Sequence, residues 1–196
     1  MKRISVLSAA ALILPFATAA AQQPAATPAP SAAGPITLSF GAFAGRYAGW
    51  LSAAFDSIPP GLYGYRPTPA QQTVGYIAQH LEDANYQLCA RFGGMTAPAT
   101  AKDSLADTLK AQWPKDTLVT RLKASLEFCQ RAFETLDDAK LADVLPAGPA
   151  GSGRTVARAR YVLAYVTDLV DHWSQIANYM RLNGLVPPSA LPRPNP

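Results

Sequence analysis

The chain has 196 residues, of which 49% are hydrophobic, and its formal net charge is +4. This length suits a single domain with a sizeable core and is short for two domains. Its lysines and arginines form no cluster interleaved with aromatic residues, so we expect no nucleic-acid partner.

Residues 1–21 carry the pattern of a secretory signal peptide. Two basic residues precede an apolar run over residues 4–16, and three small residues then end at Ala21. A membrane-spanning helix needs about 20 apolar residues, whereas this run is shorter and is interrupted by Pro15. We therefore expect cleavage after Ala21, a periplasmic or secreted protein, and no membrane span in its mature form.

Both ends of the remaining chain have compositions that disfavour regular structure. Residues 22–36 are rich in Pro, Ala and Ser, which predicts a flexible spacer. Residues 189–196 form a Pro-rich tail. A single domain over residues 37–188 is expected between them.

Four segments of this domain carry apolar residues at helical spacing. The first covers about residues 40–55, the second starts near Pro69, the third follows Pro114, and the fourth runs over about residues 154–182. No segment shows the sustained alternation that a strand needs. Because four amphipathic helices must bury their apolar faces together, the sequence predicts an all-α four-helix bundle.

The chain has two cysteines, Cys89 and Cys129, on the second and third predicted helices. In an oxidising compartment a disulfide between them is favoured. The alternative is that each thiol is a small buried apolar group on its own helix.

Polar side chains on the apolar faces are the candidate site residues, because burial of such groups is costly unless they are paired. His80 lies on the apolar stripe of the second helix, and Asp168 and His172 lie one turn apart on that of the fourth. Two imidazoles and a carboxylate are a ligand set for a divalent ion with an open position, and an open site predicts a concave pocket there. The alternative is an ion pair between Asp168 and His172 beside a hydrogen-bonded core histidine.

Two more polar residues accompany this trio. Gln175 follows His172 on the same face, where it could orient a ligand or form a hydrogen bond between helices. Asp171 is expected to face outward or to steady a ligand histidine.

Several residues together resemble the DinB/YfiT-like family of metalloenzymes. The resemblance rests on Tyr65-Arg66-Pro67, on His80, and on a run in the fourth helix: Asp168, His172, Trp173, Gln175, Tyr179 and Arg181, followed by Gly184 and Pro187-Pro188. It implies a four-helix bundle in which three histidines hold a divalent metal, two of them as a pair on the last helix. Here Asp168 stands where the third histidine is expected.

The resemblance implies a metal-dependent hydrolase or transferase that uses an activated water or thiol on a small-molecule substrate. Zinc is the expected ion, with nickel or iron as alternatives. The alternative function is a non-catalytic helical bundle with a degenerate site, either a binding module or a homodimer.

Overall fold

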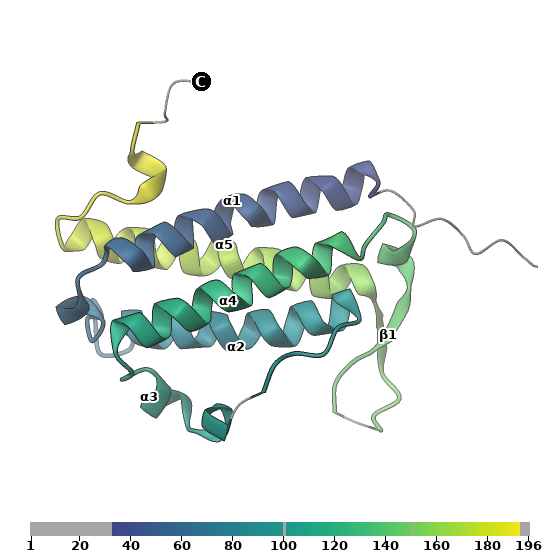
Figure 1. Ribbon diagram of the computed structural model, residues 1–196, viewed down its shortest axis with the longest axis horizontal. Helices are drawn as coiled ribbons and strands as arrows, with labels where there is room; N and C mark the ends of the chain where they lie inside the picture. Colours follow the sequence, from purple (N-terminus) through teal and green to yellow (C-terminus); the bar gives the residue numbers. More distant parts are fainter. Residues whose placement is uncertain (1–32, 100, 150, 193–196) are drawn as a thin grey trace, which may run out of the picture. The chain divides into compact units, whose positions relative to one another are not determined.

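Four long helices lie side by side in the computed structural model, which describes residues 33–99, 101–149 and 151–192. They are α1 (Pro35–Ser57), α2 (Val74–Gly93), α4 (Lys115–Glu134) and α5 (Arg158–Leu182). In Figure 1, α1 and α5 run in one direction and α2 and α4 in the other. The predicted all-α four-helix bundle is confirmed, while the predicted signal peptide at residues 1–21 lies outside the described residues.

Helix α1 begins at Pro35, inside the segment predicted as a spacer. Proline suits the first helical turn because its missing N–H would have no helical partner there. The next two backbone N–H groups, those of Ile36 and Thr37, donate to the Asp138 carboxylate at 3.1 and 2.7 Å. A residue about 100 positions away thus caps the helix.

Helix α2 begins at Val74, so the predicted start near Pro69 is wrong. The Thr73 side chain accepts a hydrogen bond from the backbone N–H of Tyr76 and caps the helix. The N–H groups of Val74 and Gly75 donate to carbonyls in the preceding loop, at Tyr65 and Tyr63. These loop contacts fix the first turn.

A short antiparallel hairpin precedes α5, with β1 at Val144–Pro146 and β2 at Thr155–Ala157. The expectation of no strands is therefore wrong at this point, and α5 starts later than predicted. The hairpin forms because Gly148, Gly151 and Gly153, all with positive φ, let the connecting loop turn back.

Five short helices complete the described chain: η1 (Pro60–Leu62), η2 (Ala101–Ser104), α3 (Asp107–Lys110), η3 (Lys140–Ala142) and η4 (Pro188–Ala190). Lys110 is buried and pairs with Asp83 of α2 and Asp107, which ties α3 to the bundle. Among the described helices, none combines the length and the apolar character needed to cross a bilayer.

The interface between α2 and α4 combines covalent and polar links. Cys89 and Cys129 form a disulfide, with Cα atoms 5.1 Å apart. The side-chain amide of Asn85 donates to Ser125 Oγ at 2.9 Å, and both residues are fully buried. This interface fixes the helix that carries His80.

Candidate metal centre

The structure brings together the three residues that the sequence singles out as ligands. His80 projects from α2, and Asp168 and His172 project from consecutive turns of α5. His80 Nε2 lies 3.8 Å and His172 Nε2 lies 3.5 Å from the same atom, Asp168 Oδ1. One ligand atom from each residue lies within 4.8 Å of the other two. The three side chains can therefore serve one ion.

The three side chains differ in exposure, and the expectation that both histidines point into the core is wrong for His80. The side chain of His172 is 6% exposed, that of Asp168 is 23% exposed, and that of His80 is 36% exposed. Because α2 buries the neighbouring Gln79 and Leu81 instead, His80 lies at the edge of the core. The cluster consequently opens to solvent on the His80 side.

Gln175 and Asp171 form a hydrogen-bonded chain that orients His172. The Gln175 side-chain amide donates to Asp171 Oδ2 at 3.1 Å, which leaves its oxygen, Oε1, facing His172 Nδ1 at 3.3 Å. The tautomer with its proton on Nδ1 donates to Gln175 Oε1 and leaves Nε2, on the side of Asp168, available to a metal ion, whereas in the metal-free protein an Nε2–H faces the Asp168 carboxylate. Both partners lie on α5, so Gln175 does not link two helices as the alternative interpretation had it.

The charges of the trio are coupled. Burial raises the pKa of Asp168, but the neighbouring imidazoles of His172 and His80 outweigh burial and bring the pKa down to about 2. The interaction of its imidazole N–H with the Asp168 carboxylate raises the pKa of His80 above its ordinary value, although burial opposes it. The carboxylate is therefore ionised throughout the physiological range.

The donor set and its spacing fit a divalent ion. Tetrahedral zinc with bonds of about 2.0–2.1 Å holds its ligand atoms about 3.3 Å apart, close to the two nitrogen–oxygen distances observed here. The second carboxylate oxygen, Asp168 Oδ2, is buried and has no hydrogen-bond partner among the described residues. An ion would satisfy a group whose burial is otherwise costly.

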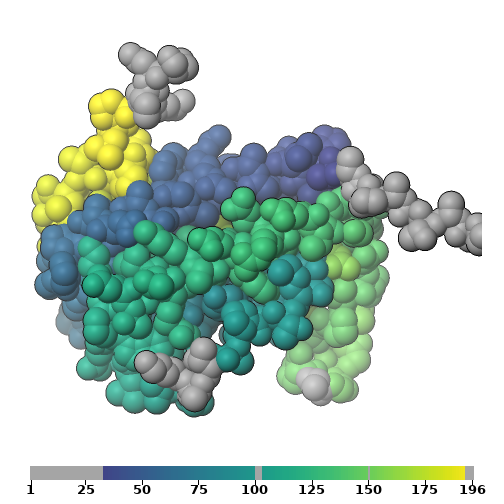
Figure 2. Space-filling model, viewed as in Figure 1, coloured from purple at the N-terminus to yellow at the C-terminus, as the bar shows by residue number. Residues whose placement is uncertain are grey.

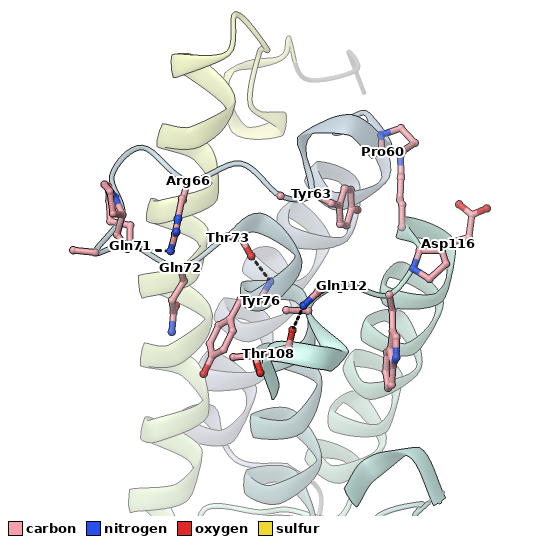
Figure 3. Close-up of a pocket in the computed structure, with 17 residues that line it drawn as sticks. Pro60, Tyr63, Arg66, Gln71, Gln72, Thr73, Tyr76, Thr108, Gln112 and Asp116 are labelled. Carbon is pink, nitrogen blue, oxygen red and sulfur yellow. Dashed lines mark hydrogen bonds between the residues drawn. The ribbon is translucent and has the colours of Figure 1, made fainter. Parts of the chain in front are cut away.

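The largest cavity described, of about 870 Å³, lies at the end of the bundle where α2 and α4 begin. Figure 3 shows Tyr63, Thr73, Tyr76 and Gln112 around it. None of the three cavities described is lined by a residue of the trio, so a pocket at the trio stays a prediction. Tyr76 connects the two regions, because its ring lies nearly parallel to the His80 ring at 6.4 Å between centroids.

Sequence reasoning passed over Tyr76, although a signal was present. The residue lies one turn before His80 on the same helix, and residues four apart on a helix are neighbours. An aromatic side chain at that spacing from a candidate ligand could have been included among the candidate site residues.

The fold and the trio define a class of protein: an antiparallel helical bundle with a candidate metal centre between its second and last long helices. The family model of the DinB superfamily matches residues 49–176, which cover helix α2 and all three trio residues. The chain belongs to the DinB superfamily.

A solved structure described as the conserved protein of locus from Enterococcus faecalis has a TM-score of 0.59 and 15% sequence identity. The similarity covers 76% of this chain and 98% of that chain, and at this identity it shows a shared fold. The comparison with curated proteins found no significant match.

Proposed function

We propose that this chain is an exported, metal-dependent hydrolase or transferase that holds a divalent ion at His80, Asp168 and His172. The observation that carries the proposal is the convergence of two imidazole nitrogens on one carboxylate whose other oxygen is buried without a partner. The N-terminal pattern of residues 1–21 supports export, and purification from the periplasm with Gln22 as the first residue is the expected outcome.

Three protein ligands leave at least one position open, and the exposed edge of His80 lies on the accessible side. A divalent ion there would polarise a substrate carbonyl or lower the pKa of a water towards neutrality. In this arrangement Gln175 keeps the His172 tautomer in its ligating form, and Asp168 supplies the negative charge that offsets the cation.

A second function is a bundle that binds without catalysis. The observation in its favour is that the cavities described lie away from the trio. On this interpretation the trio is a partly buried ionic cluster that specifies packing.

Metal content of the untagged protein separates the two functions. We expect close to one zinc, nickel or iron per chain in the wild type and almost none in His172→Ala, because the most buried ligand is then absent. Gln175→Ala should keep the ligands but weaken metal affinity by about 10- to 100-fold, since its hydrogen bond orients one of them. Asp116→Asn, an exposed change at the start of α4, is the control and should bind like the wild type.

The pH dependence of thermal stability is a second test, because its sign differs between the metal-free and the metal-bound protein. Without metal, the raised pKa of His80 means that its pairing with Asp168 stabilises the fold fully at low pH and is lost as pH rises through the folded pKa. With metal, protons compete for the imidazole, so the stabilisation by zinc should grow as pH rises. Metal at about 100 times Kd adds about 2.7 kcal/mol to the free energy of unfolding.

Absence of metal after loading with zinc and with nickel, together with a stability that only falls as pH rises, would contradict the metal-dependent function. It would leave the non-catalytic bundle.

A further inference from the structure

A second cavity, of about 780 Å³, forms a groove between α1 and α4. Figure 2 shows this face of the molecule, with α1 in purple and blue along one side and α4 in green along the other. Small residues of α1 line one wall (Gly41, Gly45, Ala48, Gly49 and Ser52), and Leu126 and Phe133 of α4 line the opposite wall. The trio lies at the junction of α2 and α5, so the groove is a different region of the bundle.

Packing within the chain does not require two of the glycines that line this groove. Gly45 and Gly49 lie inside a regular helix, where each costs about 1 kcal/mol relative to alanine. A Cβ atom added at either position would meet no other atom within 4 Å. Their smallness therefore preserves open space along α1.

Two buried polar residues line the groove, Thr37 of α1 and Tyr165 of α5. Tyr165 of α5 is 2% exposed, and its ring is held between those of Phe92 and Phe133. Tyr165 is a lining residue of the groove, and no described residue forms a hydrogen bond with its hydroxyl. The Tyr165 hydroxyl therefore has no protein partner among the described residues, and a polar atom of a bound molecule in the groove would supply one.

The rim of the groove constrains the charge of what binds. Glu127 and Glu134 line it and have no basic partner among the described residues. Lys123 also lines it, but its ammonium group pairs with Asp56 at 2.6 Å. The rim therefore disfavours an anion such as a free fatty acid.

We propose that the groove between α1 and α4 binds a neutral, elongated apolar molecule that places a hydroxyl or carbonyl oxygen against the Tyr165 hydroxyl. The volume lies within the range of pockets for small ligands, and the walls are largely apolar with few polar groups, as in such sites. Binding in the groove needs no metal and no reaction at the trio, although Tyr165 lies one turn before Asp168 on α5.

The test is fluorescence titration with the neutral probe N-phenyl-1-naphthylamine, followed by displacement with dodecan-1-ol. The wild type should bind the probe and release it to the alcohol. Gly45→Leu combined with Gly49→Leu should weaken probe binding at least about tenfold and raise Tm, because the leucines fill the groove and favour the helix. Ala53→Leu adds the same side chain to α1 outside the groove and should leave binding unchanged.

Tyr165→Phe tests the proposed hydrogen bond between the Tyr165 hydroxyl and the oxygen of the bound molecule. Displacement by dodecan-1-ol should need about tenfold more alcohol, as expected for a lost hydrogen bond in a buried site, while probe affinity stays within about twofold.

Three results would overturn the proposal. The first is probe binding that survives the double leucine variant. The second is a lower Tm for that variant, which would mean that the fold itself needs the glycines. The third is a wild-type dimer that the double variant converts to monomer, which would mean that a second copy of the chain covers the groove.

Discussion

Helix α4 packs against two neighbours in two different ways. Towards α2 it makes a disulfide, and Arg121 pairs with the buried carboxylate of Glu82 at 2.7 Å. Gly93 of α2 also approaches Ala132 of α4 so closely that a Cβ atom on the glycine would lie 2.7 Å from the alanine Cβ. Towards α1 the same helix leaves a cavity of about 780 Å³ beside small residues.

The difference indicates that the α2–α4 interface is held more rigidly than the α1–α4 interface. His80 comes from α2, which packs directly against α5 and is held by α4 as well. A metal centre works only if its ligands are kept within about 0.5 Å of their productive places, and a cross-linked helix pair provides that support. Helix α1 supplies no member of the trio, so its interface with α4 can stay open.

Among the changes that test this comparison, removal of the disulfide is expected to lower the stability most. The bond closes a loop with a sequence separation of 40, and the loop-entropy relation assigns such a loop about 4 kcal/mol. Cys89→Ala combined with Cys129→Ala should therefore lower Tm by about 8–16 °C for a domain of this size.

Calorimetry with and without dithiothreitol is the measurement. The reductant should lower Tm of the wild type and leave the double variant unchanged. A wild type that is insensitive to reductant would show that the α2–α4 link contributes little to stability.

The next largest effect is expected from the Glu82–Arg121 pair. Glu82 is 3% exposed, so Arg121→Met leaves a buried carboxylate without its cation and should cost about 3 kcal/mol at pH 7. Burial already raises the pKa of Glu82, although Arg121 opposes it. Without Arg121 the carboxyl takes up a proton more readily, so the loss should shrink as pH falls from 7 to 5.

Urea unfolding at both pH values measures this effect. Arg131→Met, an exposed arginine on the same helix, is the control and should change stability by less than about 0.5 kcal/mol. A loss in Arg121→Met that is equal at both pH values would mean that the effect comes from the contacts of Arg121 with Asp103 and Trp113 and not from the buried charge of Glu82.

The bundle could be predicted from the sequence because each helix carries its own apolar stripe and its own end signals. Gly94 and Gly184, with φ of 64° and 71°, lie at the ends of α2 and α5, where glycine commonly stops a helix. The start of α2 was placed too early, because it is fixed by hydrogen bonds to the loop carbonyls of Tyr63 and Tyr65. Such contacts cannot be predicted from the spacing of apolar residues along the sequence.

The candidate site, like the bundle, could be predicted from the sequence only in part. Asp168 and His172 could be paired from their spacing on one helix, and the resemblance pointed to His80. The buried face of α2 was predicted incorrectly, because that face includes the polar residues Glu82 and Asn85. Their partners, Arg121 and Ser125, lie on another helix. Polar residues become part of a core only through partners that a single-helix pattern cannot show.

The smallest effects come from alanine at one glycine of each interface, and they should have opposite signs. Gly93→Ala places a methyl group against Ala132 and should cost about 1–3 kcal/mol. Gly45→Ala adds a methyl group in open space on α1 and should gain about 1 kcal/mol from helix propensity. Ala53→Gly, on an exposed position of α1, should lose a similar amount and calibrates the propensity effect in urea unfolding. A loss of stability in Gly45→Ala would mean that α1 is packed at Gly45 after all, and the contrast between the two faces of α4 would then not hold.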